Sequence, residues 1–255
     1  MADRQGNTIV TAAVLVIGDE ILSGRTKDKN SGYIADYLTG VGIDLREVRV
    51  VPDIEDEIVA AVNALRARYD HVFTTGGIGP THDDITADAI ARAFGVSIDV
   101  DERAVAMLLE RMSKADLNEA RLRMARIPAG ATLIANPVSK APGFTIGNVH
   151  VMAGVPSIMH AMLDAVGATL ETGRKMHSVS LQAHLKEGDI ATPFRALQAK
   201  YPDVGMGSYP SYSEENGFTT TLVLRSRDED LLAAAEAEAH TMLDALRASV
   251  ANGKR

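Results

Sequence analysis

Apolar residues follow two alternating patterns along the first half of the chain. Apolar runs at 12–17 and 71–73 are typical of buried strands, and a further strand is expected over 44–51. The segments between them, 30–39 and 54–69, place apolar residues on one face of a helix. Strand, helix and strand in this order predict a mostly parallel sheet covered by helices on both faces. The fold class is therefore α/β, and a ligand is expected at the carboxyl ends of the strands.

The pattern becomes less regular after the third strand. A helix is expected to end at Phe94, because Gly95 follows the last apolar position, and two more helices are expected over 101–112 and 157–170. Between these two helices, residues 127–156 alternate short apolar runs with glycine and proline. This spacing predicts short strands joined by tight loops.

A polar segment at 171–175 separates this region from a second set of elements. The expected order there is βαββα, formed by a strand at 176–185, a helix at 189–200, strands at 204–210 and 218–225, and a helix at 228–251. Such a unit forms a small antiparallel or mixed sheet with helices on one face. We therefore predict a large domain over 8–172 and a smaller α+β domain over 173–255.

Composition narrows the class of protein. The chain has 255 residues, 46% hydrophobic and 24% charged, which is an ordinary globular composition. Its formal net charge of -8 argues against nucleic acid as a partner, because phosphate backbones need clustered lysine and arginine. The absence of cysteine excludes a disulfide framework and a thiol nucleophile, and it fits a cytoplasmic location. No apolar run is long enough to predict a membrane span.

Three glycines and two adjacent carboxylates share the turn that follows the third strand. Gly76, Gly77 and Gly79 permit a tight turn and a close approach of the backbone to a ligand, and free amides at the start of the next helix attract anions. Asp83 and Asp84 would repel a bare phosphate. Their presence therefore implies a cation or a proton-transfer task beside a phosphate site.

The turn after the first strand repeats this combination of glycine and carboxylates, with Gly18, Asp19 and Glu20. If the first and third strands are neighbours in a parallel sheet, both turns lie at the same edge and face one ligand. Asp19 and Glu20 would then converge with Asp83 and Asp84. An oxygen-rich cluster of this kind suits Mg²⁺ or another hard divalent ion.

Simpler roles exist for several of these side chains. Asp84 or Thr86 could only cap the following helix, although capping needs one such side chain and leaves Asp83 unexplained. Asp28 could cap the helix that begins near Asn30 or contact the ligand. Both alternatives remain open for each residue from the sequence.

Other enzyme classes lose support because their motifs are missing. The sequence has no G-x-S-x-G elbow, no Walker lysine and no G-x-G-x-x-G fingerprint, which argues against serine hydrolases, P-loop proteins and Rossmann oxidoreductases. The histidines show no metal-binding spacing, and His82 has no assigned role. Ser139 and Lys140 could contact a phosphate, although the glycine and proline that follow them more often only form turns.

Together these motifs resemble the MoaB/Mog molybdopterin-binding domain family. They resemble the N-terminal domain of CinA, the competence-damage-inducible protein, and even more closely the molybdopterin-binding-like domain of eukaryotic FAD synthase. The resemblance covers roughly residues 9–170, and residues 176–246 are similar to the small KH-like domain that follows in CinA. The segments that carry the resemblance are 18–24, Asp28 with Asn30, 51–53, 76–86, 118–128, 141–144 and 154–156.

The resemblance implies a three-layer α/β/α fold and hydrolysis of a nucleotide diphosphate such as ADP-ribose or FAD. It also implies a divalent metal, Mg²⁺ or Co²⁺, with potassium, and a homo-oligomer, dimer or trimer. In molybdenum-cofactor enzymes of this fold the position matching Asp84 is an essential aspartate, and the position matching Asp83 is commonly basic. Because that position is acidic here, metal-assisted pyrophosphate cleavage is favoured over direct binding of a molybdopterin phosphate. Asp19 stands where CinA usually has threonine.

We therefore expect a metal-dependent nucleotide-diphosphate pyrophosphatase in which Asp83 and Asp84 are catalytic and hold the metal. The alternatives are adenylyl transfer to molybdopterin, against which Asp83 counts, and a non-catalytic module that binds a pterin or a nucleotide. RNA binding by the second domain is not expected, because residues 205–208 lack basic side chains. The residues expected at the small-molecule ligand are Gly18, Asp19, Glu20, Asp28, Asn30, Thr75, Gly76, Gly77, Gly79, Thr81, Gly143, Gly154 and Pro156.

Overall fold

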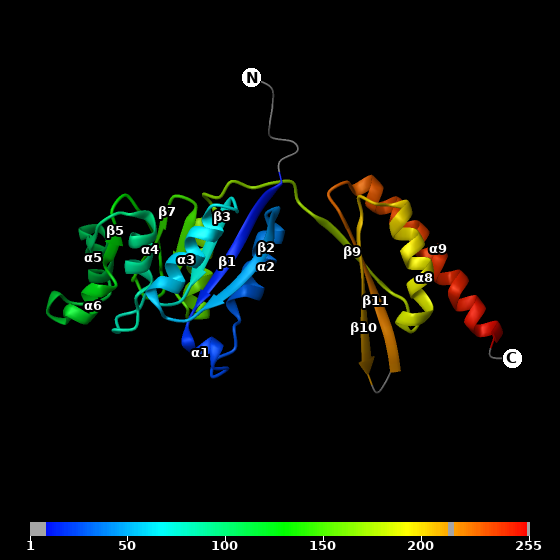
Figure 1. The fold of residues 1–255 in the computed structure, drawn as a ribbon, viewed down its shortest axis with the longest axis horizontal. Helices are drawn as coiled ribbons and strands as arrows, with labels where there is room; N and C mark the ends of the chain where they lie inside the picture. Colours follow the sequence, from blue (N-terminus) through cyan, green and yellow to red (C-terminus); the bar gives the residue numbers. More distant parts are fainter. Residues whose placement is uncertain (1–8, 214–216, 254–255) are drawn as a thin grey trace, which may run out of the picture. The chain divides into compact units, whose positions relative to one another are not determined.

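The structure is a computed structural model that describes residues 9–213 and 217–253. Contacts within the chain divide it into two units, the first ending at Gly173 and the second beginning at Arg174. The larger unit contains the elements from β1 to α7, and the smaller unit contains those from β9 to α9 (Figure 1). Among the helices of these residues, none has both the length and the apolar character needed to cross a bilayer.

A six-stranded sheet forms the middle layer of the larger unit, in the order β2-β1-β3-β8-β7-β6. The first four strands in this order are mutually parallel, and β7 and β6 continue the sheet in antiparallel pairs. Val16 of β1 lies opposite Thr75 of β3, so the carboxyl ends of these two strands share one edge, which is the condition under which both turns could face one ligand. The strands are β1 (Val10–Ile17), β2 (Ile43–Val51), β3 (His71–Thr75), β6 (Thr132–Ile134), β7 (Gly143–Ile146) and β8 (Val149–Met152).

Helices cover both faces of this sheet. Helices α2 (Asn30–Gly40) and α7 (Pro156–Gly167) pack on one face, and α3 (Glu55–Arg66) and α4 (Thr86–Phe94) pack on the other. The two faces of the buried strand β1 therefore belong to two different hydrophobic cores, which explains why its sequence is apolar without alternation. The mostly parallel α/β/α architecture expected from the sequence is confirmed.

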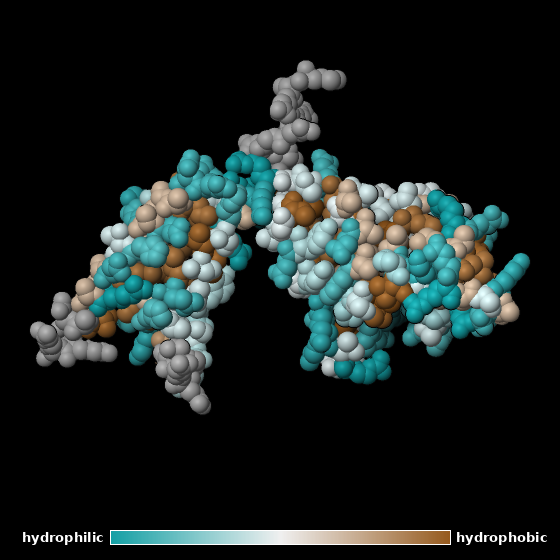
Figure 2. Space-filling model, turned by 180° about the vertical axis from the view of Figure 1, so that it is seen from behind, coloured by the Kyte–Doolittle hydropathy of each residue, from teal (hydrophilic) through white to brown (hydrophobic). Residues whose placement is uncertain are grey.

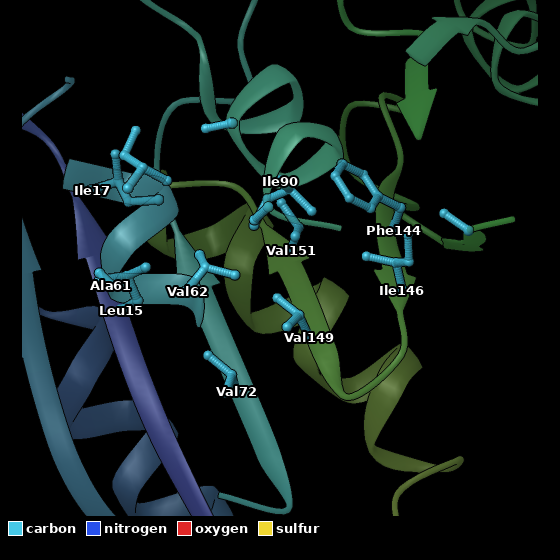
Figure 3. Packing of buried hydrophobic residues seen from close by; sticks show 14 of the residues in the cluster. Leu15, Ile17, Ala61, Val62, Val72, Ile90, Phe144, Ile146, Val149 and Val151 are labelled. Atoms are coloured by element: carbon cyan, nitrogen blue, oxygen red, sulfur yellow. The ribbon is translucent and has the colours of Figure 1, made fainter. Parts of the chain in front are cut away.

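Figure 3 shows the core between the sheet and α3 and α4. Leu15 and Val72 from the sheet lie beside Val62 of α3, and Val151 lies near Ile90 of α4. All five side chains are fully removed from water. Burying a side chain of this size stabilises the fold by about 1.5–3 kcal/mol.

A smaller layer beside the sheet was not predicted in detail. It contains a two-stranded antiparallel sheet, and the helix expected over 101–112 is shorter and ends at Leu109. Short helices also form in the turn after β1 and before β5, where the sequence pattern indicated none. The elements of this layer and the short helix of the first turn are α1 (Asp19–Leu22), β4 (Ile98–Val100), α5 (Glu102–Leu109), η1 (Lys114–Asp116), α6 (Glu119–Arg123) and β5 (Arg126–Pro128).

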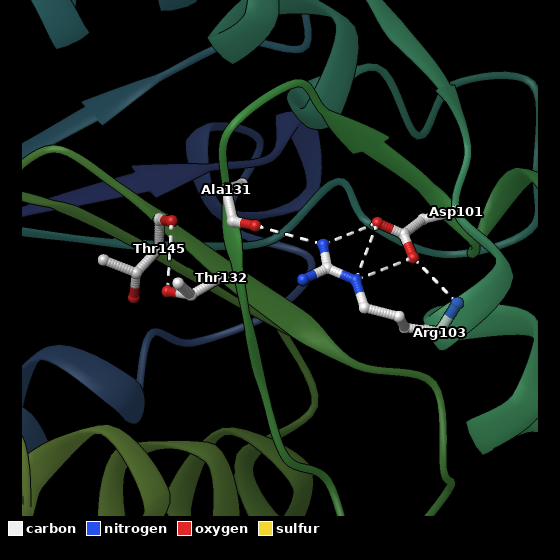
Figure 4. Close-up of polar contacts among 5 residues, drawn as sticks. All are labelled: Asp101, Arg103, Ala131, Thr132 and Thr145. Carbon is white, nitrogen blue, oxygen red and sulfur yellow. Dashed lines mark hydrogen bonds and ion pairs between the residues drawn. The ribbon is translucent and has the colours of Figure 1, made fainter.

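Polar contacts connect this layer to the main sheet (Figure 4). The guanidinium of Arg103 donates to both carboxylate oxygens of Asp101 and to the carbonyl of Ala131, at 2.7 to 3.2 Å. Asp101 also caps α5 by accepting from the Arg103 backbone N–H at 2.8 Å. The Thr132 hydroxyl donates to the Thr145 carbonyl at 3.5 Å, between β6 and β7. These contacts fix the start of α5 against the loop that leads into the sheet.

The smaller unit has the predicted βαββα order. Its three strands form an antiparallel sheet in the order β10-β11-β9, and the two helices pack on one face of it. The first strand ends at Gln182, earlier than expected, because Ala183 and Leu185 are buried in the following loop. The elements are β9 (His177–Gln182), α8 (Glu187–Lys200), β10 (Gly205–Ser213), β11 (Gly217–Ser226) and α9 (Glu229–Gly253).

The described surface is mixed rather than uniformly polar. Figure 2 shows hydrophilic residues over most of one side, interrupted by small apolar patches. In the smaller unit, Tyr212 and Phe218 face each other across the β10–β11 hairpin with ring centroids 4.9 Å apart, and both are exposed. Scattered exposed apolar side chains are normal on soluble domains and do not by themselves identify a partner.

Candidate functional site

Two positions in the turn after β3 require glycine. Gly76 has a φ of +106° and Gly77 a φ of +67°, a conformation that other residues rarely adopt. A Cβ on Gly76 would lie 2.1 Å from the Ile17 carbonyl oxygen, and one on Gly77 would lie 2.2 Å from the Thr86 hydroxyl. The turn therefore passes directly between the end of β1 and the first residue of α4.

This glycine turn leaves several backbone N–H groups free. The Thr86 N–H donates to the Gly77 carbonyl at 3.0 Å, and the Thr86 hydroxyl donates to the Gly76 carbonyl at 2.9 Å, so the carbonyls are held against α4. Within residues 9–213 and 217–253, the N–H groups of Gly77, Ile78 and Gly79 have no acceptor. Successive free N–H groups of this kind form an anion-binding concavity.

The same three residues line a cleft of about 560 Å³ at the carboxyl edge of the sheet. This volume falls in the range of sites for small molecules and cofactors. The cleft has carboxylates from Glu20 and Asp84 in its lining and no lysine or arginine there, so a phosphate would need a cation to accompany it. The apolar part of the lining is formed by Ile78, Met124, Ala141, Ala153, Val155, Pro156, Ile158 and Met162.

Asp84 holds the loop that follows the glycine turn. Its carboxylate accepts from the Thr81 N–H at 2.8 Å and from the Thr81 hydroxyl at 2.5 Å. Helix α4 begins after Ile85 and receives no side-chain cap, so the simpler interpretation of Asp84 or Thr86 as a helix cap is wrong. Gly79 permits this arrangement, because a Cβ there would lie 2.5 Å from the Asp84 carboxylate.

Asp83 and Asp84 are placed differently. Asp83 is exposed and does not line the cleft. Its charge acts instead on Asp53, which accepts from the Asp19 N–H at 2.9 Å. The pKa of Asp53 is raised, chiefly because burial removes its carboxylate from water and also because Asp19, Glu20 and Asp83 are negatively charged.

The expected convergence of Asp19, Glu20, Asp83 and Asp84 is only partial, because Glu20 and Asp84 line the cleft and the other two do not, and the metal site stays a prediction. In the part of the chain that the structure describes, no three carboxylate or histidine side chains lie together so that they could hold a metal ion. The physical reason is that the Asp84 carboxylate turns toward the N–H and hydroxyl of Thr81. The adjacent Asp83 stays outside the cleft lining.

The two carboxylates in the cleft nevertheless fit a cation that is also bound by a ligand. Glu20 and Asp84 line the same cleft as the free N–H groups of the glycine turn. Mg²⁺ keeps several waters and is usually bound by one or two carboxylates together with substrate phosphates. The cleft thus suits a cation that arrives with a diphosphate, and it does not suit a metal held by the protein alone.

A narrow pocket of about 60 Å³ adjoins the cleft, and both are lined by Glu20, Thr26, Gly76, Gly154 and Pro156. Asp28 lies in its lining, and its carboxylate accepts from the Asn30 and Ser31 N–H groups at 2.9 and 3.2 Å. Asp28 therefore holds the first N–H groups of α2, one of the two roles that the sequence left open, although the N-cap residue itself is Lys29. The other residues that line this pocket are Val16, Ile17, Ile21, Lys27, Lys29, Asn30 and Thr75.

Some residues near the site gave no clear signal in the sequence. The guanidinium of Arg123 donates to the Asp84 carbonyl at 3.2 Å, and its Nε is buried without a partner among the described residues. Asn136 lines the cleft and binds Ser139, which lines it as well. Lys140, for which the sequence left a phosphate contact open, forms an ion pair with Glu110 at 2.7 Å.

Comparison with known proteins agrees with this geometry. Residues 13–172 match the family model of the probable molybdopterin binding domain. The chain belongs to this molybdopterin-binding family. Residues 175–250 match a second model, the FAD synthase middle domain. The two matches fall on the two units of the structure.

Individual relatives support the same family. The chain is 36% identical over 211 residues to a protein of Pyrobaculum calidifontis, covering 78% of this chain and 80% of that one. It is 41% identical over 169 residues to a CinA-like protein of Citrifermentans bemidjiense, covering 64% of this chain and 41% of that protein. A solved structure, the protein CinA with unknown function from Thermoplasma acidophilum, superposes with a TM-score of 0.60 at 39% identity, covering 63% of this chain and 98% of that one.

The molybdopterin-binding domain brings most of the predicted ligand residues to the cleft or the narrow pocket. These are Glu20, Asp28, Asn30, Thr75, Gly76, Gly77, Gly79, Asp84, Gly154 and Pro156. Those that line neither cavity are Gly18, Asp19, Thr81, Asp83 and Gly143. Gly143 has a packing role instead, because a Cβ there would lie 2.3 Å from the Val151 carbonyl oxygen of the neighbouring strand.

Proposed function

We propose that this chain is a metal-dependent pyrophosphatase acting on nucleotide diphosphates such as ADP-ribose or FAD. The observation that carries the proposal is the row of free N–H groups at Gly77, Ile78 and Gly79, in a cleft that also holds two carboxylates. The N–H groups suit phosphate oxygens, and the carboxylates suit the cation that accompanies a diphosphate. A diphosphate with its cation accounts for both the free N–H groups, which attract anions, and the carboxylates, which would repel an anion alone.

The reaction adds water across the bridge between two phosphorus atoms. One P–O bond to the bridging oxygen breaks, one P–O bond to the water oxygen forms, and ADP-ribose yields AMP and ribose 5-phosphate. The glycine turn would hold the diphosphate in place, and Glu20 and Asp84 would hold the cation. A divalent cation such as Mg²⁺ or Co²⁺, when bound, neutralises charge that develops on the phosphate oxygens.

The apolar side of the cleft supports a ligand that carries a flat ring. Met124, Ile158 and Met162 line the same cleft as the glycine turn. Adenine, flavin and pterin rings are all apolar on their faces and polar at their edges, which suits such a wall.

We also propose that the chain forms a homo-oligomer, dimer or trimer, which size-exclusion chromatography with light scattering would measure.

The alternative function is binding of a molybdopterin, with or without adenylyl transfer to it. The match of residues 13–172 to the probable molybdopterin binding domain favours this alternative. A pterin phosphate would use the same free N–H groups, and its ring would use the same apolar wall. The acidic Asp83 counts against it, since the charges of Asp19, Glu20 and Asp83 around Asp53 make this rim repulsive to a phosphate without a cation.

The decisive assay measures AMP release from ADP-ribose and FAD with Mg²⁺ or Co²⁺, with and without potassium. Asp84→Asn keeps an acceptor for Thr81 but removes the charge, so turnover should fall at least about 100-fold. His82→Gln, an exposed neighbour in the same loop, is the matched control. Full turnover by a folded Asp84→Asn variant would contradict the mechanism. Tight nucleotide binding with no turnover under any metal would favour the binding module.

A further inference from the structure

Asn30 has a buried hydrogen-bond acceptor with no partner. The residue is only 6% exposed, and its Nδ2 donates to the Gly154 carbonyl at 2.8 Å. Because the Gly154 carbonyl is an acceptor, it must face the NH₂ side of the amide, and the oxygen Oδ1 is the atom that remains. Oδ1 has no hydrogen-bond partner in the described part of the chain.

Both residues of this bond line the narrow pocket beside the cleft. The pocket, at about 60 Å³, is large enough to admit a small polar group of a ligand. An unpaired acceptor in a buried wall loses its hydration without compensation, which makes it receptive to a donor supplied from outside. The pocket at Asn30 therefore calls for a hydrogen-bond donor rather than for an apolar group.

The charges around the pocket decide which kind of donor fits. Its charged lining residues are Glu20, Lys27, Asp28 and Lys29, two acids and two bases. Asp28 is already committed to the first N–H groups of α2. With no net charge in the lining, neither a phosphate nor an ammonium gains from entering, and a neutral O–H donor is preferred.

The position of the pocket indicates where on the ligand this donor lies. Gly76 and Gly154 line both the narrow pocket and the cleft, and Gly76 begins the turn with the free N–H groups. A group in the pocket is thus adjacent to a phosphate on the turn, while the ring lies on the apolar wall of the wider cleft. In a nucleotide, the sugar is the group bonded to the phosphate.

We propose that the narrow pocket is a sugar subsite in which Asn30 Oδ1 accepts a hydrogen bond from a hydroxyl of the ligand's ribose. This inference rests on the proposed nucleotide function and deepens it. The subsite makes the protein select ribonucleotides over their deoxy analogues. It also explains why a fully buried amide in α2 keeps one of its two polar atoms unpaired.

The test compares two ligands on the unchanged protein. Calorimetry with Mg²⁺ measures the affinities of ADP and of 2′,3′-dideoxy-ADP, with inorganic pyrophosphate as the probe of the phosphate site alone. We expect ADP to bind about tenfold more tightly than the dideoxy analogue, which corresponds to about 1.4 kcal/mol. Pyrophosphate should bind regardless of the subsite, because it has no sugar.

Two neighbouring variants form a matched pair. Asn30→Ala removes the acceptor and should abolish the tenfold preference while pyrophosphate binding is retained. Ser31→Ala, at the next residue, also removes a buried polar atom, the Ser31 hydroxyl, which has no partner among the described residues. Because Ser31 does not line the pocket, the preference should remain in this variant. Thermal unfolding of both variants shows whether they fold.

The outcomes separate this inference from the proposed function. Equal affinity of the wild-type protein for ADP and its dideoxy analogue, with pyrophosphate bound, would overturn the sugar subsite and leave the phosphate site standing. An unchanged preference in a folded Asn30→Ala variant would overturn it as well. Failure to bind either ADP or pyrophosphate would overturn the proposed function, and the subsite with it.

Discussion

A buried histidine pair in the middle of the larger unit predicts a specific loss of stability in acid. His150 of β8 lies in the sheet beside His71 of β3, with 3.1 Å between His150 Nε2 and His71 Nδ1. On its other side, His150 Nδ1 lies 3.0 Å from the Thr145 hydroxyl, and its ring stacks on Phe73. The ring is 5% exposed, so a proton on it would place a charge inside the sheet.

The magnitude follows from the shift in pKa. Burial, and secondly the charge on His71, lowers the pKa of His150 from 6.5 to about 3. Between these values the unfolded chain binds a proton that the folded chain does not bind, so the stability is complete above pH 6.5 and falls as the pH decreases toward 3. At pH 5 this single group lowers the free energy of unfolding by about 2 kcal/mol relative to pH 8.

Urea unfolding at pH 8 and at pH 5 measures this loss. His150→Gln places an amide where the ring nitrogen faces His71 and does not titrate, so it should lose about 2 kcal/mol less than the wild-type protein over the same interval. His160→Gln, on the surface helix α7 where the ring stacks on Tyr33, should lose as much as the wild type. Equal losses for the wild type and His150→Gln would refute the reasoning.

Two further substitutions test the glycine turn and the sheet beside it. Gly76→Ala should lower the free energy of unfolding by more than about 2 kcal/mol and remove phosphate binding, because its Cβ would lie 2.1 Å from the Ile17 carbonyl. Gly130→Ala, also at a positive φ but with open space around the Cβ, should cost only about 1–2 kcal/mol in denaturant unfolding, and equal costs for the two would contradict the steric argument. Thr74→Val should raise stability by about 1 kcal/mol, since the Thr74 hydroxyl is fully buried and has no partner in the described structure. A lower melting temperature for Thr74→Val would contradict that prediction.

Much of the fold could be predicted because its signals are local. The apolar run of β1 faces a core on each side, and its continuous pattern therefore indicated a buried parallel strand. The alternation of strands and helices predicted the parallel sheet with a ligand at the carboxyl ends of its strands, and the structure shows that β1 and β3 are neighbours there. By contrast, α6 is a short helix without an apolar stripe, capped by the Asn118 side chain, and no periodic pattern marks it. Arg123 at its end was missed for the same reason.

The site was predicted in position but not in detail. The sequence indicated which turns carry the glycines and carboxylates and that they meet if β1 and β3 are neighbours. The direction of each side chain depends on local hydrogen bonds. Thr81 offers two donors to Asp84, and this turns the Asp84 carboxylate into its own loop. Asp53 follows β2 at the same edge, and its contact with the Asp19 N–H requires a neighbouring strand that no local pattern specifies.

The most direct test of the phosphate site is the amide NMR spectrum of the labelled protein during titration with ADP-ribose and Mg²⁺. The account predicts large, saturable shifts for the amides of Gly77, Ile78 and Gly79, because their N–H groups, free of acceptors in the described residues, would donate to phosphate oxygens. The amide of Gly130, which lines neither the cleft nor the narrow pocket, should not move. Saturation that shifts other amides and leaves those of the glycine turn unchanged would contradict the account.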